Sequence, residues 1–199
     1  MLSSLRVLSA ICLVFYFSSV GSAAQAQVAE MRVGTNIHDI EILGFGTNKE
    51  KENSVAINAE LVFEEPQFLK WALSPQPYIG GSYNLEGNTS YGGGGLLWRQ
   101  GFGNKFYGDF SFGLVIHNGN LEFDRPTTPA ESLIFQEQTR ENIEFGSRIL
   151  FRQQVALGYR FNETYSTEFF IEHLSHGRIL SSRSNEGLDV IGGRIAKRF

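Results

Sequence analysis

Hydrophobic and polar residues alternate along most of the chain with a period of two residues. In the segment 148–161, apolar residues such as Phe151 oppose polar residues such as Arg152 and Gln154. Gln153 is the one polar residue on the apolar side of this segment. Successive side chains of a β-strand point to opposite faces, so this period predicts strands with one apolar and one polar face.

Eight segments carry this pattern, with edges good to about 3 residues. Most are about 10 residues long, which is the length with which a tilted strand crosses a bilayer. An even number of strands places both ends of the mature chain on the same side of the membrane, the periplasm. The predicted strands are 29–38, 54–64, 75–84, 91–100, 105–116, 147–161, 165–176 and 188–199.

The connections between these segments also alternate in length. Short turns on one side and long loops on the other are the rule for outer-membrane barrels. The connection 65–74 is longer than that rule suggests. Tight turns are predicted at 101–104 and 162–164, and loops around 39–53, 85–90, 117–146 and 177–187.

Alternation alone does not say which face meets lipid, because a soluble lipocalin-like barrel alternates too. Three features favour the membrane barrel. Tyr159 and Phe161 stand where an aromatic girdle belongs, and the chain ends on Phe199 at the close of an alternating strand. A set of charged and polar residues shares the other face and predicts a charge-paired interior: Glu60, Glu64, Arg148, Arg152, Gln154, Arg160 and Glu172. The sequence therefore predicts an all-β, eight-stranded antiparallel transmembrane β-barrel of the outer membrane.

The N-terminus has the features of an export signal. Arg6 provides a short positive region, residues 7–20 are apolar, and 24–26 form a small-x-small cleavage site. The apolar stretch is shorter than the ~20 residues of a spanning helix, so a cleaved signal is preferred to a retained anchor. Cleavage near Ala26 leaves residues 27–199 as a single barrel domain.

Composition narrows the class further. Cys12 is the only cysteine and lies inside the apolar stretch, so the mature chain is expected to hold no disulfide. The net charge of −4 argues against nucleic-acid binding, for which a basic stripe is expected. His38 and His117 have no Asp, Glu or Cys nearby at the spacing of metal ligands, so they are interpreted as interior or loop residues. The run Gly92–Gly95 lies in a strand pattern, where glycine relieves crowding or allows a kink.

One spacing points to chemistry. His173 and Ser175 are two residues apart on a predicted strand, so their side chains share a face, which extrapolation makes the apolar one. An imidazole beside a hydroxyl can act as a general base for attack on an ester carbonyl. Asp189 has the parity to orient the histidine from the last strand, whereas Glu186 has the opposite parity and is expected in the loop.

The same region resembles the PagL-type lipid A 3-O-deacylase family. The shared pattern is His-x-Ser-(Asn or His) at 173–176, followed by Asn-x-Gly-x-(Asp or Glu) at 185–189, and the similarity extends over nearly the whole mature chain. The resemblance implies an eight-stranded barrel with a metal-free site that faces the outer leaflet. In that site Ser175 is the nucleophile, His173 the base and Asp189 the orienting acid.

Two positions depart from the best-known form of the pattern. Asp189 stands where glutamate is found, and His176 replaces an asparagine connected with the oxyanion hole. By parity the His176 side chain is expected to face the interior. The backbone N–H groups of His176 and Gly177 are the weaker candidates for oxyanion donors.

The predicted function is therefore lipid A 3-O-deacylation by a serine esterase with a Ser/His/Asp triad. The expected partners are lipid A or lipopolysaccharide as substrate and the lipids of the outer membrane, with a homodimer left open and no cofactor. An apolar groove beside the strands is expected to hold the acyl chain. Two alternatives remain at this point: an outer-membrane phospholipase-type esterase, and a non-catalytic structural barrel.

Overall fold

The computed structural model describes residues 27–40 and 51–199. The predicted signal sequence 1–26, with Cys12, lies outside the described residues, as does the middle of the first loop, 41–50.

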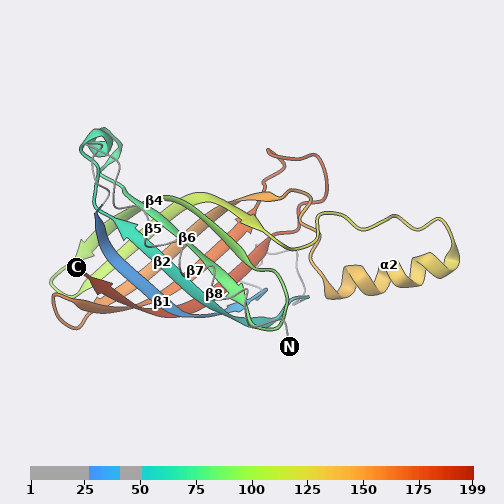
Figure 1. The fold of residues 1–199 in the computed structure, drawn as a ribbon, viewed down its shortest axis with the longest axis horizontal. Coiled ribbons are helices and arrows are strands. Elements are labelled where there is room, and N and C mark those ends of the chain that lie inside the picture. The colour runs from blue at the N-terminus through green and yellow to red at the C-terminus, as the bar shows by residue number, and fades with distance from the viewer. Residues whose placement is uncertain (1–26, 41–50) are drawn as a thin grey trace, which may run out of the picture.

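Eight antiparallel strands form a closed barrel in which each strand pairs with its neighbours in sequence and β8 pairs with β1 (Figure 1). The predicted strand number, order and positions are confirmed. The strands are β1 (Val28–His38), β2 (Ser54–Phe63), β3 (Gln76–Asn84), β4 (Tyr91–Phe102), β5 (Phe106–His117), β6 (Ile149–Arg160), β7 (Tyr165–Ser175) and β8 (Leu188–Arg198).

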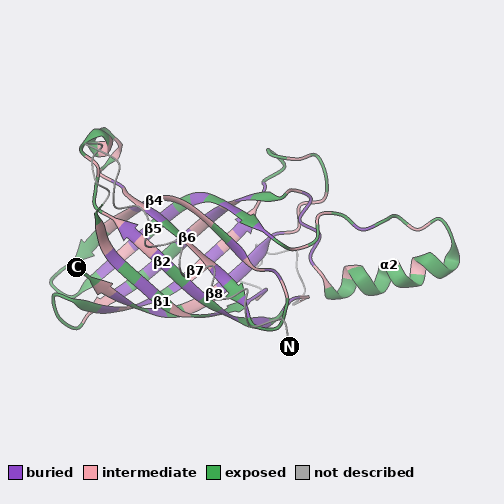
Figure 2. Cartoon of the chain, viewed as in Figure 1, coloured by how far each residue is buried: buried purple, intermediate pink, exposed green. Residues whose placement is uncertain are grey.

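The two faces of the barrel wall differ as the alternation predicts. Along β5, Phe112 and Ile116 point outward and are 41% and 61% exposed, whereas Ser111 and His117 point inward and are buried. Figure 2 shows this alternation as diagonal bands of buried and exposed residues over the whole wall. An apolar outer surface with polar groups inside is the arrangement of a barrel surrounded by lipid.

Part of the interior is filled by a network of paired charges. Arg152 Nε lies 2.7 Å from Glu172 Oε2, and Arg194 Nη1 lies 2.8 Å from Glu60 Oε2. Such pairing offsets the desolvation cost of buried charges. The buried or largely buried members of the network are Glu30, Arg32, Glu60, Arg99, Asp109, Arg152, Glu168, Glu172 and Arg194.

Two residues that the sequence placed in this network lie elsewhere. Glu64 and Arg148 are exposed and stand beyond the strand ends, where alternation no longer fixes the direction of a side chain. Arg148 Nη1 instead donates to the carbonyl oxygen of His117 at 2.7 Å. Arg160 is only partly buried, and its guanidinium lies over the Tyr107 ring.

Part of the interior at the loop end is filled by apolar side chains from a connection, which alternation did not predict. Ile143 and Phe145, from the connection between β5 and β6, are fully buried against inward-facing residues of the strands. The backbone N–H of Phe145 donates to the carbonyl oxygen of Asn120, which ties this segment to the start of the same connection. The connection therefore closes the end of the barrel with an apolar layer.

Two connections hold helices that the sequence interpretation did not include. The predicted loop 117–146 contains α2 (Pro129–Glu141), which extends away from the barrel at the loop end (Figure 1). The connection 65–74 contains the 3-10 helix η2 (Gln67–Ala72) at the opposite end. No helix in the described part of the chain is long and apolar enough to cross a membrane.

Aromatic side chains gather at the end with the short turns. The Tyr159 ring packs edge-on against Phe106 and Phe161, with centroids 5.1 and 5.6 Å apart. Phe199, at the end of β8, is also exposed. This position fits the aromatic girdle predicted from Tyr159 and Phe161, since such rings favour the boundary between lipid and water.

Candidate active site

The three residues singled out in the sequence come together on the outer surface near the loop end of the barrel. His173 on β7 is in register with Asp189 on β8. Ser175 follows two residues later on β7, and its side chain therefore points the same way as that of His173. The antiparallel pairing of β7 and β8 thus brings residues 16 positions apart into one site.

The side chains form a continuous hydrogen-bonded chain. His173 Nδ1 lies 2.5 Å from Asp189 Oδ1, and His173 Nε2 lies 3.1 Å from Ser175 Oγ. The tautomer consistent with this chain carries a proton on Nδ1, donated to the carboxylate, and leaves Nε2 free to accept the serine proton. A hydroxyl, a base and an orienting acid in this order are the arrangement of serine hydrolases.

Exposure falls along the chain from the serine to the acid. Ser175 and His173 are half-buried, and the His173 side chain is 31% exposed, whereas that of Asp189 is only 6% exposed. The reactive end therefore faces the surroundings of the barrel while the carboxylate is shielded. A shielded carboxylate interacts more strongly with an imidazolium than an exposed one does.

Two residues of the 185–189 motif support the site, and the sequence interpretation had assigned them no role. A Cβ atom added to Gly187 would lie 2.8 Å from His173 Cε1, so only glycine leaves room for the imidazole ring. Asn185 Oδ1 accepts the backbone N–H of His176 at 3.0 Å and holds the chain as it leaves β7. The fixed spacing of the motif from Asp189 is the signal that could have identified both.

The two candidate oxyanion donors differ in availability. The His176 N–H is already hydrogen-bonded to Asn185, and the His176 side chain is buried with Nε2 2.8 Å from the Ser184 carbonyl oxygen. The Gly177 N–H has no hydrogen-bond partner among residues 27–40 and 51–199, and Gly177 adopts a φ of +60° in the exposed turn after β7. Of the two backbone groups, only that of Gly177 is free to contact a substrate.

Glu186, the other acid of the second motif, has a different environment. Its carboxylate lies 2.7 Å from Lys51 Nζ and accepts the backbone N–H of Glu144 at 2.8 Å. Glu186 therefore links the last loop to two other loops. Neither of these hydrogen-bond partners belongs to the candidate triad. The parity argument that separated Glu186 from Asp189 agrees with this placement.

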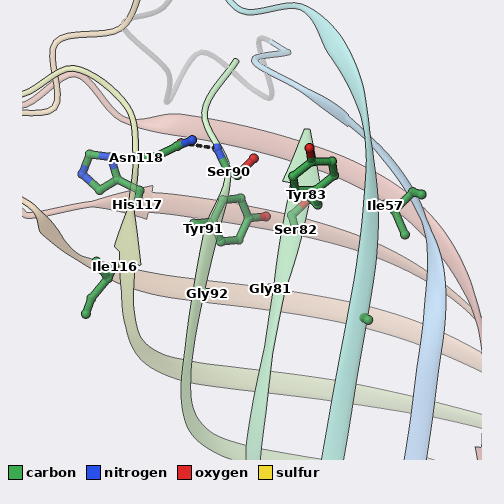
Figure 3. Close-up of a pocket in the computed structure, with 11 residues that line it drawn as sticks. Ile57, Gly81, Ser82, Tyr83, Ser90, Tyr91, Gly92, Ile116, His117 and Asn118 are labelled. Atoms are coloured by element: carbon green, nitrogen blue, oxygen red, sulfur yellow. Dashed lines mark hydrogen bonds between the residues drawn. The ribbon is translucent and has the colours of Figure 1, made fainter. Parts of the chain in front are cut away.

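One surface groove of the barrel lies away from these residues. It has a volume of about 620 Å³, runs over β2 to β5, and is lined by Tyr83, Gly92 and Ile116 among others (Figure 3). Among the lining residues, the Ser90 N–H donates to Asn118 Oδ1 at 2.7 Å (Figure 3). None of Ser175, His173 and Asp189 lines this groove.

The remaining histidines have polar interior contacts. His38 Nε2 lies 3.2 Å from Ser82 Oγ, and His117 Nε2 lies 2.7 Å from the Ser147 carbonyl oxygen. Within residues 27–40 and 51–199, no group of three His, Cys, Asp or Glu side chains is arranged to hold a metal ion.

Fold and candidate site together define a class: an eight-stranded antiparallel barrel of the outer-membrane type, with hydrogen-bonded serine, histidine and aspartate side chains on its outer surface. A family model described as lipid A 3-O-deacylase (PagL) matches residues 52–198. The chain belongs to the PagL lipid A 3-O-deacylase family.

Comparison with the PagL crystal structure supports the fold. The crystal structure of the outer membrane enzyme PagL is similar, with a TM-score of 0.56 and 11% identity over 86% of this chain and 100% of that one. The N-terminal β-barrel domain of Pseudomonas aeruginosa OprF has a TM-score of 0.45 and 10% identity, over 86% of this chain and 99% of that one. A search of curated proteins found no match.

Proposed function

We propose that this chain is a lipid A 3-O-deacylase that hydrolyses the 3-linked hydroxyacyl ester of lipid A in the outer leaflet. Family membership supports the reaction class. The observation that carries the proposal is the hydrogen-bonded chain from Asp189 through His173 to Ser175 on the outward face of the barrel. No cofactor takes part in the proposed mechanism.

In the proposed mechanism Ser175 is the nucleophile and His173 the general base. The Ser175 Oγ attacks the ester carbonyl carbon while His173 Nε2 takes the hydroxyl proton, and Asp189 stabilises the imidazolium that forms. Collapse of the tetrahedral intermediate breaks the bond to the sugar oxygen, which receives the proton from His173. Water, deprotonated by the same imidazole, then hydrolyses the acyl-enzyme and restores Ser175.

The outward direction of the site supports a lipid substrate. Ser175 lies in register with Phe151 on β6, and Ile149, one outward position further along that strand, is also apolar and 44% exposed. A substrate that stands in the outer leaflet presents its ester to this surface directly, so its acyl chain remains in an apolar environment throughout the reaction. We place the mature chain, from about residue 27 onward, in the outer membrane with the loop end outward.

The reaction is tested by expressing wild-type protein and Ser175→Ala in an outer-membrane host whose lipid A carries a 3-linked ester. We expect mass spectrometry of extracted lipid A to show loss of one hydroxyacyl chain with the wild type only. Heat-modifiable migration on gels, compared between the two proteins, controls for folding of the barrel. Unchanged lipid A from a folded wild-type barrel would contradict the proposal.

The same experiment separates the two alternative functions. A phospholipase-type esterase would leave lipid A intact and would instead release lysophospholipids in a Ser175-dependent way. A structural barrel would release neither product, and its phenotype would be insensitive to Ser175→Ala.

A further inference from the structure

A fourth polar side chain stands beside the proposed triad on the lipid-facing surface. Gln153 on β6 is in register with His173 on β7, which is itself in register with Asp189 on β8. The three side chains thus form a row across three neighbouring strands, all on the outward face. On the other side of Gln153 the row continues with Phe112 on β5, which is apolar.

The surroundings of Gln153 give it no structural reason to be polar. Its outward neighbours on the same strand are Phe151 and Val155, and the latter is 61% exposed. Its half-buried side chain has no hydrogen-bond partner in the part of the chain that the structure describes. An amide that faces lipid without a partner is costly, so its presence requires a contribution from outside the protein.

The register also places Gln153 within reach of the reacting atoms. Ser175 is in register with Phe151, so Gln153 is its diagonal neighbour, at a separation of about 7–8 Å that long side chains can bridge. A Gln153 side chain that extends toward Ser175 can therefore reach the carbonyl oxygen of an ester bound there. Side chains in adjacent strands are held by the backbone ladder, which favours a preorganised contact.

The backbone near Ser175 offers too few free N–H groups to form an oxyanion hole alone. Of the two candidates after Ser175, the His176 N–H is bonded to Asn185, so Gly177 is left as the one free N–H of the pair. Oxyanion holes ordinarily use two or more donors aimed at the position where negative charge develops. We propose that the side-chain amide of Gln153 is a catalytic oxyanion donor, which binds the carbonyl oxygen of the scissile ester together with the Gly177 N–H.

The inference rests on the proposed function and adds a residue to it. As Ser175 Oγ forms its bond to the carbonyl carbon, the π-electron pair moves to the carbonyl oxygen and the serine proton moves to His173. The Gln153 N–H then donates to the resulting oxyanion. The interaction strengthens as charge develops, so Gln153 lowers the barrier more than it tightens substrate binding.

The test compares kcat and KM of wild type, Gln153→Leu and Gln153→Glu, measured as release of hydroxy fatty acid from lipid A in mixed micelles. Leucine removes the donor, and glutamate keeps the shape but presents acceptor oxygens. We expect kcat to fall about 10²- to 10³-fold in both variants. In Gln153→Leu, KM and the pH at half-maximal rate should stay close to wild type, because neither ground-state binding nor the charge around His173 is altered. The pH profile is compared only for this variant, since a carboxylate at position 153 would itself favour protonated His173.

Val155→Leu is the matched control, since it changes the next outward position of the same strand. It should retain wild-type kcat. Gln153→Leu replaces a lipid-facing amide with an apolar group, so its barrel should fold at least as well as wild type in the heat-modifiability assay.

Three results would overturn the inference. Full kcat in Gln153→Glu would mean that no donor is needed at this position. A rise in KM alone in Gln153→Leu would mean that Gln153 acts in ground-state binding. A shifted pH profile in Gln153→Leu would mean that Gln153 positions His173. Each of these leaves the proposed function intact, provided that Ser175→Ala in the same assay is inactive. Absence of release by the wild type would instead refute the proposed function and this inference together.

Discussion

At the scale of single residues, two neighbouring strands position the His173 imidazole between a carboxylate and a hydroxyl. Asp189 approaches His173 from the neighbouring strand, whereas Ser175 approaches it from the same strand two positions on. One contact is therefore set by strand pairing and the other by the two-residue period of the backbone. Neither depends on a loop conformation, which makes the geometry of the site rigid.

Asp189→Asn tests the acid. The amide keeps the size of the side chain but cannot stabilise an imidazolium, so we expect kcat for lipid A deacylation to fall about 10³- to 10⁴-fold. Glu186→Gln is the matched control, because Glu186 bonds to Lys51 and to the Glu144 backbone away from His173. An inactive Glu186→Gln with an active Asp189→Asn would reverse the assignment of the acid.

Gly187→Ala tests the room left for the imidazole ring. The added Cβ would lie 2.8 Å from His173 Cε1 and 3.1 Å from the Leu174 carbonyl oxygen, so the ring must move relative to Ser175. A displacement of about 1 Å can cost 10²-fold in rate, and we expect a loss of that order in kcat with the barrel still folded.

Gly101→Ala is the control for that substitution, since its added Cβ would meet nothing within 4 Å. Rates are compared in the same micelle assay. Equal activity of wild type and Gly187→Ala would show that the ring position is not held by this contact.

At the scale of secondary structure, the strands were predicted from the sequence, whereas the two helices and the packing of the long connection were not. Alternation is imposed by the covalent geometry of an extended chain between two different environments, so all eight strands could be found from the sequence. The burial of Ile143 and Phe145 inside the barrel arises from tertiary packing of a long connection, and no local pattern encodes it. Glu64 and Arg148 were misplaced because they lie just past the strand ends, where alternation no longer fixes the direction of a side chain.

Helix α2 could have been predicted from a local signal. Thr128 and Glu131 form a capping box, in which Thr128 Oγ1 accepts the Glu131 N–H at 3.3 Å and Glu131 Oε2 accepts the Thr128 N–H at 3.2 Å. A Thr-x-x-Glu sequence with proline at the first helical position is a known helix start. The candidate triad was predicted without a capping signal. Strand parity placed Asp189 on the same face as His173, and the two residues are in register in the structure.

The capping box makes helix α2 sensitive to acid. Hydrogen bonds from the backbone and side chain of Thr127, with those of Thr128, lower the pKa of Glu131. Because the pKa is lower in the helix than in the open loop, the stabilisation is present above the ordinary pKa of 4.5 and is lost as pH falls through the lowered value.

We therefore expect amide exchange protection of residues 129–141, relative to intrinsic rates, to decrease below about pH 4.5. Thr128→Ala, which removes the other half of the box, should lower the protection at neutral pH by about 1 kcal/mol. Protection that is equal in wild type and Thr128→Ala would contradict the role of the cap.

At the scale of the whole molecule, the residues that stabilise the barrel and the residues proposed to carry the reaction lie on opposite faces of its wall. The charge network that fills part of the interior and the proposed triad on the outside use different faces of the same strands. Glu172 points inward to Arg152, while the next residue, His173, points outward to Ser175. Substitutions in the network should therefore change unfolding, and substitutions on the outer row should change rate.

Arg152→Ala tests the interior network. The guanidinium lies between Glu60 and Glu172, and its loss leaves two buried carboxylates without that partner. Removing one member of a buried ion pair costs about 3–5 kcal/mol, and we expect a decrease of that size in the free energy of unfolding in urea and micelles. The exposed Arg148→Ala should change it by no more than about 0.5 kcal/mol.

The most direct test of the central claim is covalent labelling of the folded barrel with a long-chain alkyl fluorophosphonate, followed by peptide mass spectrometry. An outward-facing, activated serine with lipid A as its substrate predicts one adduct, on Ser175, that is slowed by excess lipid A and absent in His173→Ala. An unlabelled Ser175 in a folded wild-type barrel, or labelling that lipid A does not slow, would contradict the account.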